Sequence, residues 1–383
     1  MVICIDIQAA VTQRAGVGRY VRHLVEYLPN HLPGHTLQLS YFDFQGKGRP
    51  AGMPADSLHP ITWCPGRLAQ LAWKTIRFPP FDWFTGPADL YHFPNFTIPP
   101  LRRGRAVVTI HDLSFVRFPE FAEQRNLDYL SATLPATLRR ADSIITVSRF
   151  SADELADIYP IDRSRIFPVY NGIGPQFTPQ SPEAITATRQ RLSLDGPYLL
   201  AVGTLEPRKN YPFLIDLFER WSGFDGQLVI AGMPGWKYEP IVRRMQTSSR
   251  TGSIRWIRFI DDHDLPALYA GASCLVMPSH YEGFGFPPLE AMACGTPVVS
   301  SNGGSLGEVL GAAALVLNTF NHDAWLDALQ RACTDTTLRE RLIREGRQQA
   351  ARFTWDQTAR MTAAAYGLSP QPGTGPNNQG STP

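Results

Sequence analysis

Short hydrophobic runs rich in β-branched residues alternate with amphipathic helical segments along most of the chain. This alternation predicts parallel strands connected by helices, because a strand that is buried on both faces reads as a continuous hydrophobic run. The strands fall into two series. The first series is expected at residues 2–6, 37–42, 88–93, 106–110, 143–147 and 166–169. The second is expected at residues 198–203, 227–231, 254–259, 274–278, 297–300 and 314–317.

The two series predict an α/β fold with two doubly wound, Rossmann-like domains, which also suits a chain of 383 residues. A stretch rich in glycine and proline, residues 171–196, lies between the series and marks the junction. We therefore expect an N-terminal domain over residues 1–172 and a C-terminal domain over residues 173–352. An amphipathic helix over 353–366 and a disordered tail over 367–383 should follow.

Charge and cysteine content narrow the classes of function. With 36 Lys and Arg against 34 Asp and Glu, the net charge of +2 provides no overall field for binding nucleic acid or an anionic membrane. The 5 cysteines form no Cys-x-x-Cys pair, which fits a reducing compartment and argues against a zinc or redox site. The start, MVICIDIQAAV, reads as a buried strand rather than a signal peptide, and no hydrophobic run reaches the roughly 18 residues of a membrane span. We expect a soluble or peripheral cytoplasmic protein that binds no nucleic acid.

Loops that directly follow strands hold the candidate chemistry, because doubly wound sheets bind ligands beyond the carboxyl ends of their strands. In QRAGVGRYV, Gly16 and Gly18 would let a ligand approach the backbone at the start of a helix, although an ordinary strand-to-helix turn explains them equally well. In VVTIHDLSF, His111 and Asp112 follow a strand and could bind a ligand or transfer a proton. A structural His–Asp pair is the alternative.

The segment LLAVGTLEPRKNYPFLIDLF predicts a strand, a loop and a helix. Asn210 is expected to cap this helix, so that Arg208 and Lys209 lie beside its positive end. Together with Gly203 and Thr204, these cations form a candidate site for a doubly charged anion. A solvated basic loop is the alternative.

The segment HYEGFGFPPLEAMACGTPVV contains two carboxylates, Glu282 and Glu290. We expect Glu290 in the first turn of a helix that ends at Gly295, where capping would explain it. Glu282 instead starts a loop that exposes the backbone N–H groups of Gly283, Phe284, Gly285 and Phe286. Beyond the next strand, a turn and a helix start predict a second group of N–H donors close to the first, at Gly303, Gly304, Ser305 and Leu306.

Together these features suit a ligand with a diphosphate and several hydroxyl groups. Arg208, Lys209 and the N–H groups would bind the phosphates, and the two carboxylates would accept hydrogen bonds from sugar hydroxyls. The run DDHD at residues 261–264 is interpreted as helix capping rather than a metal site, so no metal and no other cofactor is expected. A nucleotide sugar fits this description.

The same segments resemble those of a known family. Glu282 and Glu290 in HYEGFGFPPLEAMACGTPVV resemble the Glu-x7-Glu element of the retaining GT-B glycosyltransferases of family 4 (group 1), which include bacterial mannosyltransferases. GTLEPRKN, NGGSLGEV, IHDLSF, TVSRFS and VYNGI are also similar to the family's recurring segments and occur in its order, so that the resemblance extends over residues 1–366. It implies the GT-B architecture, in which two Rossmann-like domains face a cleft. The final helix, here residues 353–366, would cross back to the first domain.

The resemblance also implies roles for individual residues. Arg208 and Lys209 would bind the donor diphosphate, and Glu290 would bind the ribose. Glu282, with the backbone of the loop that follows it, would bind the donor sugar, and His111 would contact that sugar from the other domain. Members of the family generally need no metal.

On this basis we expect a retaining glycosyltransferase that moves a hexose, with mannose from GDP-mannose as the first choice, to a hydroxyl of a glycan or lipid-linked saccharide in polysaccharide biosynthesis. One alternative is a glycoside hydrolase that uses Glu282 and Glu290 as acid and nucleophile. Another is a catalytically inactive sugar-nucleotide-binding subunit, because Thr204 replaces an arginine that many relatives carry after the strand glycine. Aromatic and basic residues at 63–84 indicate an acceptor loop or a peripheral membrane contact, with an ordinary packed helix and loop as the alternative.

Overall fold

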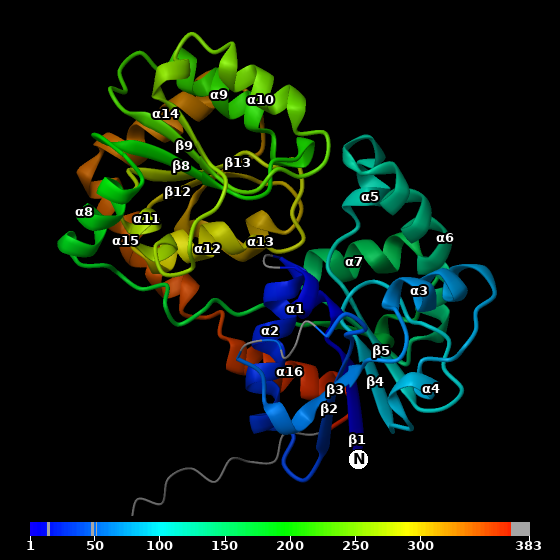
Figure 1. Ribbon diagram of the computed structural model, residues 1–383. Helices are drawn as coiled ribbons and strands as arrows, with labels where there is room; N and C mark the ends of the chain where they lie inside the picture. Colours follow the sequence, from blue (N-terminus) through cyan, green and yellow to red (C-terminus); the bar gives the residue numbers. More distant parts are fainter. Residues whose placement is uncertain (14–15, 47–49, 51, 369–383) are drawn as a thin grey trace, which may run out of the picture.

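Two parallel β-sheets organise the molecule (Figure 1), for which the computed structural model describes residues 1–13, 16–46, 50 and 52–368. The strands of the first sheet are β1 Val2–Asp6, β2 Thr36–Phe42, β3 Leu58–Ile61, β4 Leu90–Phe93, β5 Arg105–Ile110, β6 Ser143–Thr146 and β7 Ile166–Pro168. Their order in space is β3-β2-β1-β4-β5-β6-β7, and every pair of neighbours is parallel. From β1 the chain adds β2 and β3 on one side of the sheet, and it then continues on the other side from β4 to β7. Doubly wound sheets bind ligands at this change of side, between β1 and β4.

The second sheet is built in the same way. Its strands are β8 Tyr198–Val202, β9 Gln227–Ala231, β10 Ile254–Ile257, β11 Cys274–Met277, β12 Val298–Ser301 and β13 Leu315–Leu317. They lie in the order β10-β9-β8-β11-β12-β13, again all parallel. The predicted fold class is therefore confirmed, and each of the twelve predicted strands ends within two residues of its observed bounds.

Strand β3 is the one strand of the described residues that the sequence pattern did not predict. It contains Pro60, which lacks a backbone N–H and is disfavoured inside a sheet. The strand lies at the edge, where it pairs with β2 alone and the missing donor has no second neighbour to serve. An edge position is where a sheet tolerates proline.

Helices cover both sheets. In the first half they are α1 Gln8–Thr12, α2 Val17–Tyr27, α3 Gly66–Thr75, α4 Asp82–Thr85, α5 Ser114–Arg117, α6 Gln124–Arg140 and α7 Arg149–Ile158. In the second half they are α8 Pro182–Arg191, α9 Tyr211–Arg220, α10 Glu239–Gln246, α11 Leu265–Ala270, α12 Phe286–Ala293, α13 Leu306–Leu310, α14 His322–Thr334 and α15 Thr336–Ala350. The chain continues into α16 Trp355–Ala365.

Each sheet separates two hydrophobic cores, because successive side chains of a strand point to opposite faces. In β1, Ile3 and Ile5 are buried in the core that contains α2, whereas Cys4 is buried in the core that contains α6. In β8, Leu199 packs with α9 and α14, and Leu200 packs on the other face with α11 and α12. Burial on both faces explains why these strands read as continuous hydrophobic runs.

Helix α16 follows the second half in sequence but packs against α2 of the first (Figure 1). Trp355, Ala359 and Ala363 are buried in the same core as β1. The crossing chain pairs with the outgoing one: Ile173 N donates to Phe353 O over 3.1 Å, and Ile173 and Thr354 form a parallel bridge. Two segments of backbone therefore connect the halves side by side. Of the predicted tail, residues 369–383 lie outside the described residues, and the N–H groups of Gly367 and Leu368 donate to the last turn of α16.

A buried histidine fixes the end of α16 to the first sheet. His92 of β4 is fully buried and forms 2.8 Å hydrogen bonds with the Tyr366 hydroxyl through Nδ1 and with the Thr109 hydroxyl through Nε2. Arg105 of β5 adds a bond from Nη1 to the Tyr366 carbonyl oxygen. Burial, with a smaller effect of His111, lowers the pKa of His92 to about 3. The imidazole is therefore neutral in the folded protein.

Replacing His92 with glutamine should weaken the pH dependence of stability. The pKa of His92 is about 3 in the folded chain against 6.5 for an unperturbed histidine, so the unfolded chain binds this proton first. Its contribution to the free energy of unfolding is complete above pH 6.5 and falls by up to about 1.4 kcal/mol per pH unit toward pH 3. We expect Tm, measured by calorimetry, to fall more between pH 7 and pH 5 in the wild type than in His92→Gln. Parallel Tm curves would contradict this role.

Candidate active site

A cavity of about 1300 Å³ lies between the two halves, beyond the carboxyl ends of both sets of strands. Most of the predicted site residues line it, namely Gly16, His111, Asp112, Gly203, Thr204, Arg208, Lys209, Glu282, Gly283, Phe284, Gly285, Phe286 and Glu290. Five others do not line it, namely Gly18, Gly303, Gly304, Ser305 and Leu306. The structure thus brings together loops that are up to 270 residues apart in sequence, as expected for parallel sheets that face one another.

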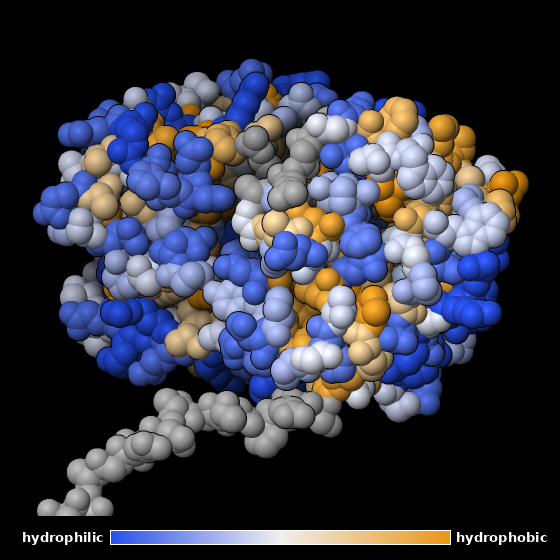
Figure 2. Space-filling view, turned by 60° about the horizontal axis from the view of Figure 1, so that its bottom comes forward, coloured by the Kyte–Doolittle hydropathy of each residue, from blue (hydrophilic) through white to orange (hydrophobic). Residues whose placement is uncertain are grey.

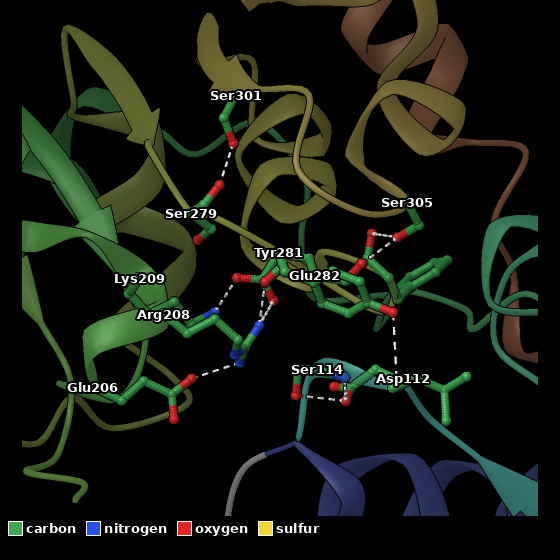
Figure 3. Close-up of polar contacts among 12 residues, drawn as sticks. Asp112, Ser114, Glu206, Arg208, Lys209, Ser279, Tyr281, Glu282, Ser301 and Ser305 are labelled. Carbon is green, nitrogen blue, oxygen red and sulfur yellow. Dashed lines mark hydrogen bonds and ion pairs between the residues drawn. The ribbon is translucent and has the colours of Figure 1, made fainter. Parts of the chain in front are cut away.

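The centre of the cavity on the side of the second sheet is a cluster of two cations and two carboxylates (Figure 3). Strand β8 ends at Val202, and a short 3₁₀ turn, Pro207–Lys209, directs both cations toward Glu282. Lys209 Nζ donates to Glu282 Oε1 over 2.7 Å, and Arg208 Nη1 lies 2.9 Å from Glu282 Oε2. Arg208 Nη2 also donates to Glu206, and Nη1 donates to the Tyr281 carbonyl oxygen. Both oxygens of Glu282 therefore contact a cation.

Electrostatics keep this cluster ionised although it is buried. Burial alone would raise the pKa of Glu282, but the charges of Arg208 and Lys209 lower it to about 2. Burial alone would lower the pKa of Arg208, and the charges of Glu282 and Glu206 raise it above its usual value. The sequence pattern predicts separate tasks, with phosphates bound by the cations and hydroxyls by the carboxylate. The structure shows instead that Glu282 holds both cations in place.

The loop after Glu282 is fixed by close backbone contacts. A Cβ on Gly283 would lie 2.2 Å from the His111 carbonyl oxygen of the other half, so only glycine fits this contact. On the opposite side, Ser305 N donates to the Glu282 carbonyl oxygen over 2.9 Å, and Ser305 Oγ lies 3.2 Å from the Phe284 carbonyl oxygen. Gly304 pairs with Glu282 as a parallel bridge. The Gly303–Leu306 segment, predicted as a second anion site, thus packs behind the Glu282 loop instead of lining the cavity.

Glu290 does not lie where the sequence predicted. Helix α12 begins at Phe286, which places Glu290 in its second turn rather than in the first turn. Its carboxylate is buried and accepts hydrogen bonds from the Tyr269 hydroxyl, over 2.7 Å, and from Arg19 Nη2. Arg19 belongs to α2 of the first half, so this ion pair joins the two sides of the cavity. Helix capping is therefore not the role of Glu290.

His111 and Asp112 face the cluster from the first half. His111 Nε2 lies 2.9 Å from the Pro94 carbonyl oxygen, which can only accept, so the proton is assigned to Nε2 and Nδ1 is left as an acceptor. Burial lowers the pKa of His111, with the Pro94 carbonyl and Asp112 opposing this effect. Asp112 Oδ1 accepts from Ser114 N over 3.0 Å and Ser114 Oγ over 2.8 Å. The pair is not a His–Asp dyad, because each side chain has its own local partner.

Two smaller predictions about helix caps are wrong. Asn210 adopts a left-handed backbone conformation, and its side chain makes no cap to α9. Asp264 precedes α11, but its carboxylate binds Arg191 and Thr188 instead of the helix N–H groups.

Gly18, predicted as part of a binding loop, instead packs against the backbone of Gln13, where a Cβ would come within 2.0 Å of the carbonyl oxygen. Within the described part of the chain, no group of three or more His, Cys, Asp or Glu side chains could hold a metal ion.

Four residues of the site were missed by sequence reasoning. They are Asp6, Arg19, Glu206 and Tyr269. Burial raises the pKa of Asp6, which lines the cavity, to about 6, with the N–H of Gln8 opposing this effect. Asp6, Arg19 and Glu206 could have been found, since Asp6 ends the first strand and the other two lie inside the quoted motifs. Tyr269 carries no local signal, because only the packing of α11 against α12 brings it to Glu290.

Hydrogen bonds outside the cavity also connect the two halves. The carboxylate of Glu308 accepts from the N–H groups of Arg149, over 3.0 Å, and Phe150, over 2.8 Å, at the start of α7. A carboxylate at a helix N-terminus is favourable. Lys237 Nζ donates to the Glu120 carbonyl oxygen over 2.7 Å. These contacts join the two halves through residues that do not line the cavity.

Comparisons with known proteins agree with this geometry. Residues 14–177 match the family model Glycosyltransferase Family 4, and residues 185–349 match Glycosyl transferases group 1. The chain is 36% identical over 283 residues to O-antigen chain mannosyltransferase B of Escherichia coli, which covers 73% of this chain and 74% of that protein. It is 28% identical over 272 residues to O-antigen chain mannosyltransferase RfbU of Salmonella typhimurium, covering 67% and 72% of the two chains.

Solved structures show the same fold. Sucrose-phosphate synthase from Thermosynechococcus elongatus superimposes with a TM-score of 0.75 at 21% identity, covering 96% of this chain and 98% of that chain. Anabaena Alr3699/HepE in complex with UDP and glucose superimposes with a TM-score of 0.73 at 18% identity, covering 95% and 99%. At these identities the likeness concerns the fold.

Removing the charge of Glu282 should destabilise the protein. Glu282→Gln leaves Arg208 and Lys209 buried with Glu206 as the remaining carboxylate of the cluster, and breaking a buried pair from one side costs about 3 kcal/mol or more. We expect this loss in guanidinium chloride unfolding followed by tryptophan fluorescence. Asp327→Asn, which breaks an exposed pair with Arg331, is the control and should cost less than about 1 kcal/mol. Equal losses in the two variants would show that the buried cluster contributes no more to the free energy of unfolding than an exposed ion pair does.

Proposed function

This chain belongs to the glycosyltransferases of family 4 (group 1), and we propose that it is a retaining mannosyltransferase that uses GDP-mannose and a glycan or lipid-linked saccharide acceptor in polysaccharide biosynthesis. The family membership makes it a glycosyltransferase with the GT-B fold. The choice of mannose is supported by the relatives, since both O-antigen enzymes with which the chain aligns over two thirds of its length are mannosyltransferases.

The observation that carries the proposal is the ion cluster of Arg208, Lys209 and Glu282 opposite His111. A nucleoside diphosphate gains negative charge as its bond to the sugar breaks. Two cations held at the end of β8 would stabilise that charge without moving, because Glu282 already fixes their orientation. Lys209 uses one of its three N–H donors for Glu282, so others are free for phosphate oxygens.

Transfer with retention requires the acceptor oxygen to bond to the anomeric carbon from the face that the diphosphate leaves. In this scheme the bond from the anomeric carbon to the phosphate oxygen breaks, the bond to the acceptor oxygen forms, and the acceptor proton passes to the departing diphosphate. His111, which lines the cavity with Nε2 bonded to the Pro94 carbonyl, would accept a hydrogen bond from a donor-sugar hydroxyl through Nδ1. We propose that Arg208 and Lys209 supply the positive charge that this step needs, so that the reaction requires no metal.

The glycoside hydrolase alternative is disfavoured by the electrostatics. Such an enzyme needs a carboxylic acid whose pKa is raised, so that it can protonate the leaving group. The cations next to Glu282 instead lower its pKa to about 2, and Glu290 is occupied by Arg19 and Tyr269. Neither group can act as the acid of a hydrolase in this arrangement. An inactive sugar-nucleotide-binding subunit differs from the proposal in turnover, which the next experiment measures.

Lys209→Ala should reduce kcat by one to three orders of magnitude, because it removes a donor aimed at the leaving diphosphate. The assay follows release of GDP with GDP-mannose and a mannose-containing glycan in the presence of EDTA. Arg243→Ala, an exposed cation on α10, is the control and should keep wild-type rates. Unchanged kcat in Lys209→Ala would overturn the diphosphate role, and loss of wild-type activity with EDTA would overturn metal independence.

Donor choice is checked by thermal shift, where GDP-mannose should raise the Tm of the protein more than UDP- or dTDP-sugars do.

An exposed hydrophobic surface lies beside α3. Six large hydrophobic side chains of residues 63–83 are 48–68% exposed: Trp63, Leu68, Leu71, Ile76, Phe78 and Trp83. Figure 2 shows hydrophobic side chains gathered on the right of the molecule, the side on which Figure 1 places α3. No helix among the described residues is long and hydrophobic enough to cross a bilayer. Arg67 and Arg103 are exposed in the same region, and we propose that this surface rests on the anionic cytoplasmic face of a membrane.

Binding to vesicles tests this contact. The wild type should co-sediment with phosphatidylglycerol vesicles and less with neutral phosphatidylcholine vesicles, because hydrophobic burial and charge attraction act together. Leu71→Asp combined with Ile76→Asp should reduce the bound fraction several-fold. Phe259→Asp, at an exposed hydrophobic residue of the second half, should not change it. Equal binding by the two variants would contradict the assignment of the surface to α3.

A further inference from the structure

The cavity extends well beyond the ion cluster, into an arm formed by α3 and α6 of the first half. Gln70, Trp73, Lys74 and Arg77 line this arm at successive helical positions on α3 and its C-terminal extension. The last turn of α6 contributes Arg139 and Arg140. The hydrophobic residues Leu68 and Leu71 project from a different face of α3. One helix therefore presents cations to the cavity and hydrophobic side chains to the outside.

The cations of this arm, Lys74, Arg77, Arg139 and Arg140, lack acidic partners. Among the residues that the structure describes, none of the four forms an ion pair with a carboxylate. This differs from the ion cluster of the second half, where each cation contacts Glu282. The acidic residue that lines the arm, Glu123, precedes the first residue of α6, and the 17-residue helix sets it about 24 Å from the arginines.

The guanidinium of Arg140 is hydrogen-bonded to a neighbouring loop rather than to its own helix. Its Nη1 donates to the Ile98 carbonyl oxygen over 3.1 Å, and its Nη2 donates to the Pro99 carbonyl oxygen over 2.8 Å. It therefore does not cap the end of α6. Burial lowers the pKa of Arg140, and the neighbouring charge of Arg77 lowers it further. Two guanidinium groups thus repel one another inside a concave site, an arrangement that a bound anion would relieve.

We propose that this arm binds a phosphate or diphosphate group carried by the acceptor, through Arg77 and Arg140 with Lys74 beside them. Arginine forks match the oxygens of a phosphate and are preferred for such contacts. The proposal rests on the proposed function, because it assigns the arm to the acceptor of that transfer. The donor diphosphate would lie at Arg208 and Lys209, and the acceptor's own phosphate would lie in the other half, with its saccharide between them.

The test compares two acceptors, one without and one with a diphosphate between the sugar and the chain: octyl α-mannoside, and mannose α-linked to octyl diphosphate. With GDP-mannose as donor, the wild-type KM should be about tenfold or more lower for the diphosphate, since hydrogen bonds between charged groups are worth a factor of this size. Arg77→Ala should bring the ratio of the two KM values toward one. Arg140→Gln, which keeps a donor for the Ile98 carbonyl, should do the same while Tm confirms that the variant is folded.

Arg125→Ala is the matched control, because Arg125 is exposed on α6, the same helix as Arg140, and does not line the cavity. It should keep the wild-type KM ratio. Equal KM values for the two acceptors in the wild type would overturn this inference and leave the proposed function intact, since transfer itself would have been observed. A site for free phosphate, rather than for the acceptor's phosphate, would also give equal KM values. In that case millimolar inorganic phosphate would change the rate of the wild type but not that of Arg77→Ala, and this result too would overturn the inference. Transfer to neither acceptor would overturn the proposed function and this inference together.

Discussion

The ion pairs between Glu282 and its two cations are the interaction on which the rest of the site depends. Two positive charges buried at the end of β8 would be costly without a counter-charge, and Glu282 supplies it from the loop that follows β11. The backbone of the same residue fixes that loop, because the Glu282 carbonyl oxygen accepts from Ser305 N and Glu282 pairs with Gly304. Glu282 therefore orients the cations through its carboxylate and anchors the loop through its backbone. A donor diphosphate would join an arrangement that exists before it binds.

The first half is fitted to this cluster at very short range. Gly283 meets the His111 carbonyl, and Arg19 reaches across to Glu290. Rings also pack across the halves, since Phe118 and Phe150 both contact the ring of Tyr281. The cavity keeps two chemically different ends. Its second-half end contains cations that are already paired with carboxylates, and the cations of its first-half arm have no carboxylate partner among the residues that the structure describes. The proposed donor and acceptor sites differ in this respect.

How far the sequence predicted this molecule depends on the range of the interactions involved. Twelve strands followed from hydrophobic runs, because burial on both faces is a local signal, whereas β3 was missed because Pro60 is compatible with a strand only at a sheet edge. Arg208, Lys209 and Glu282 were found from the loops that follow strands. The partner of Glu290 was not, since Arg19 lies 271 residues away and only the assembled halves bring it close. Likewise, the pairing of Glu282 with both cations is a product of folding that no local motif specifies.

The two chain segments that join the halves also constrain how they can move. Ile173 on the outgoing segment and Thr354 on the returning one pair side by side, and α16 is packed into the first core. A change in the angle between the halves would therefore bend both segments at once. It would also break the hydrogen bonds by which Glu308 and Lys237 of the second half contact Arg149 and Glu120 of the first.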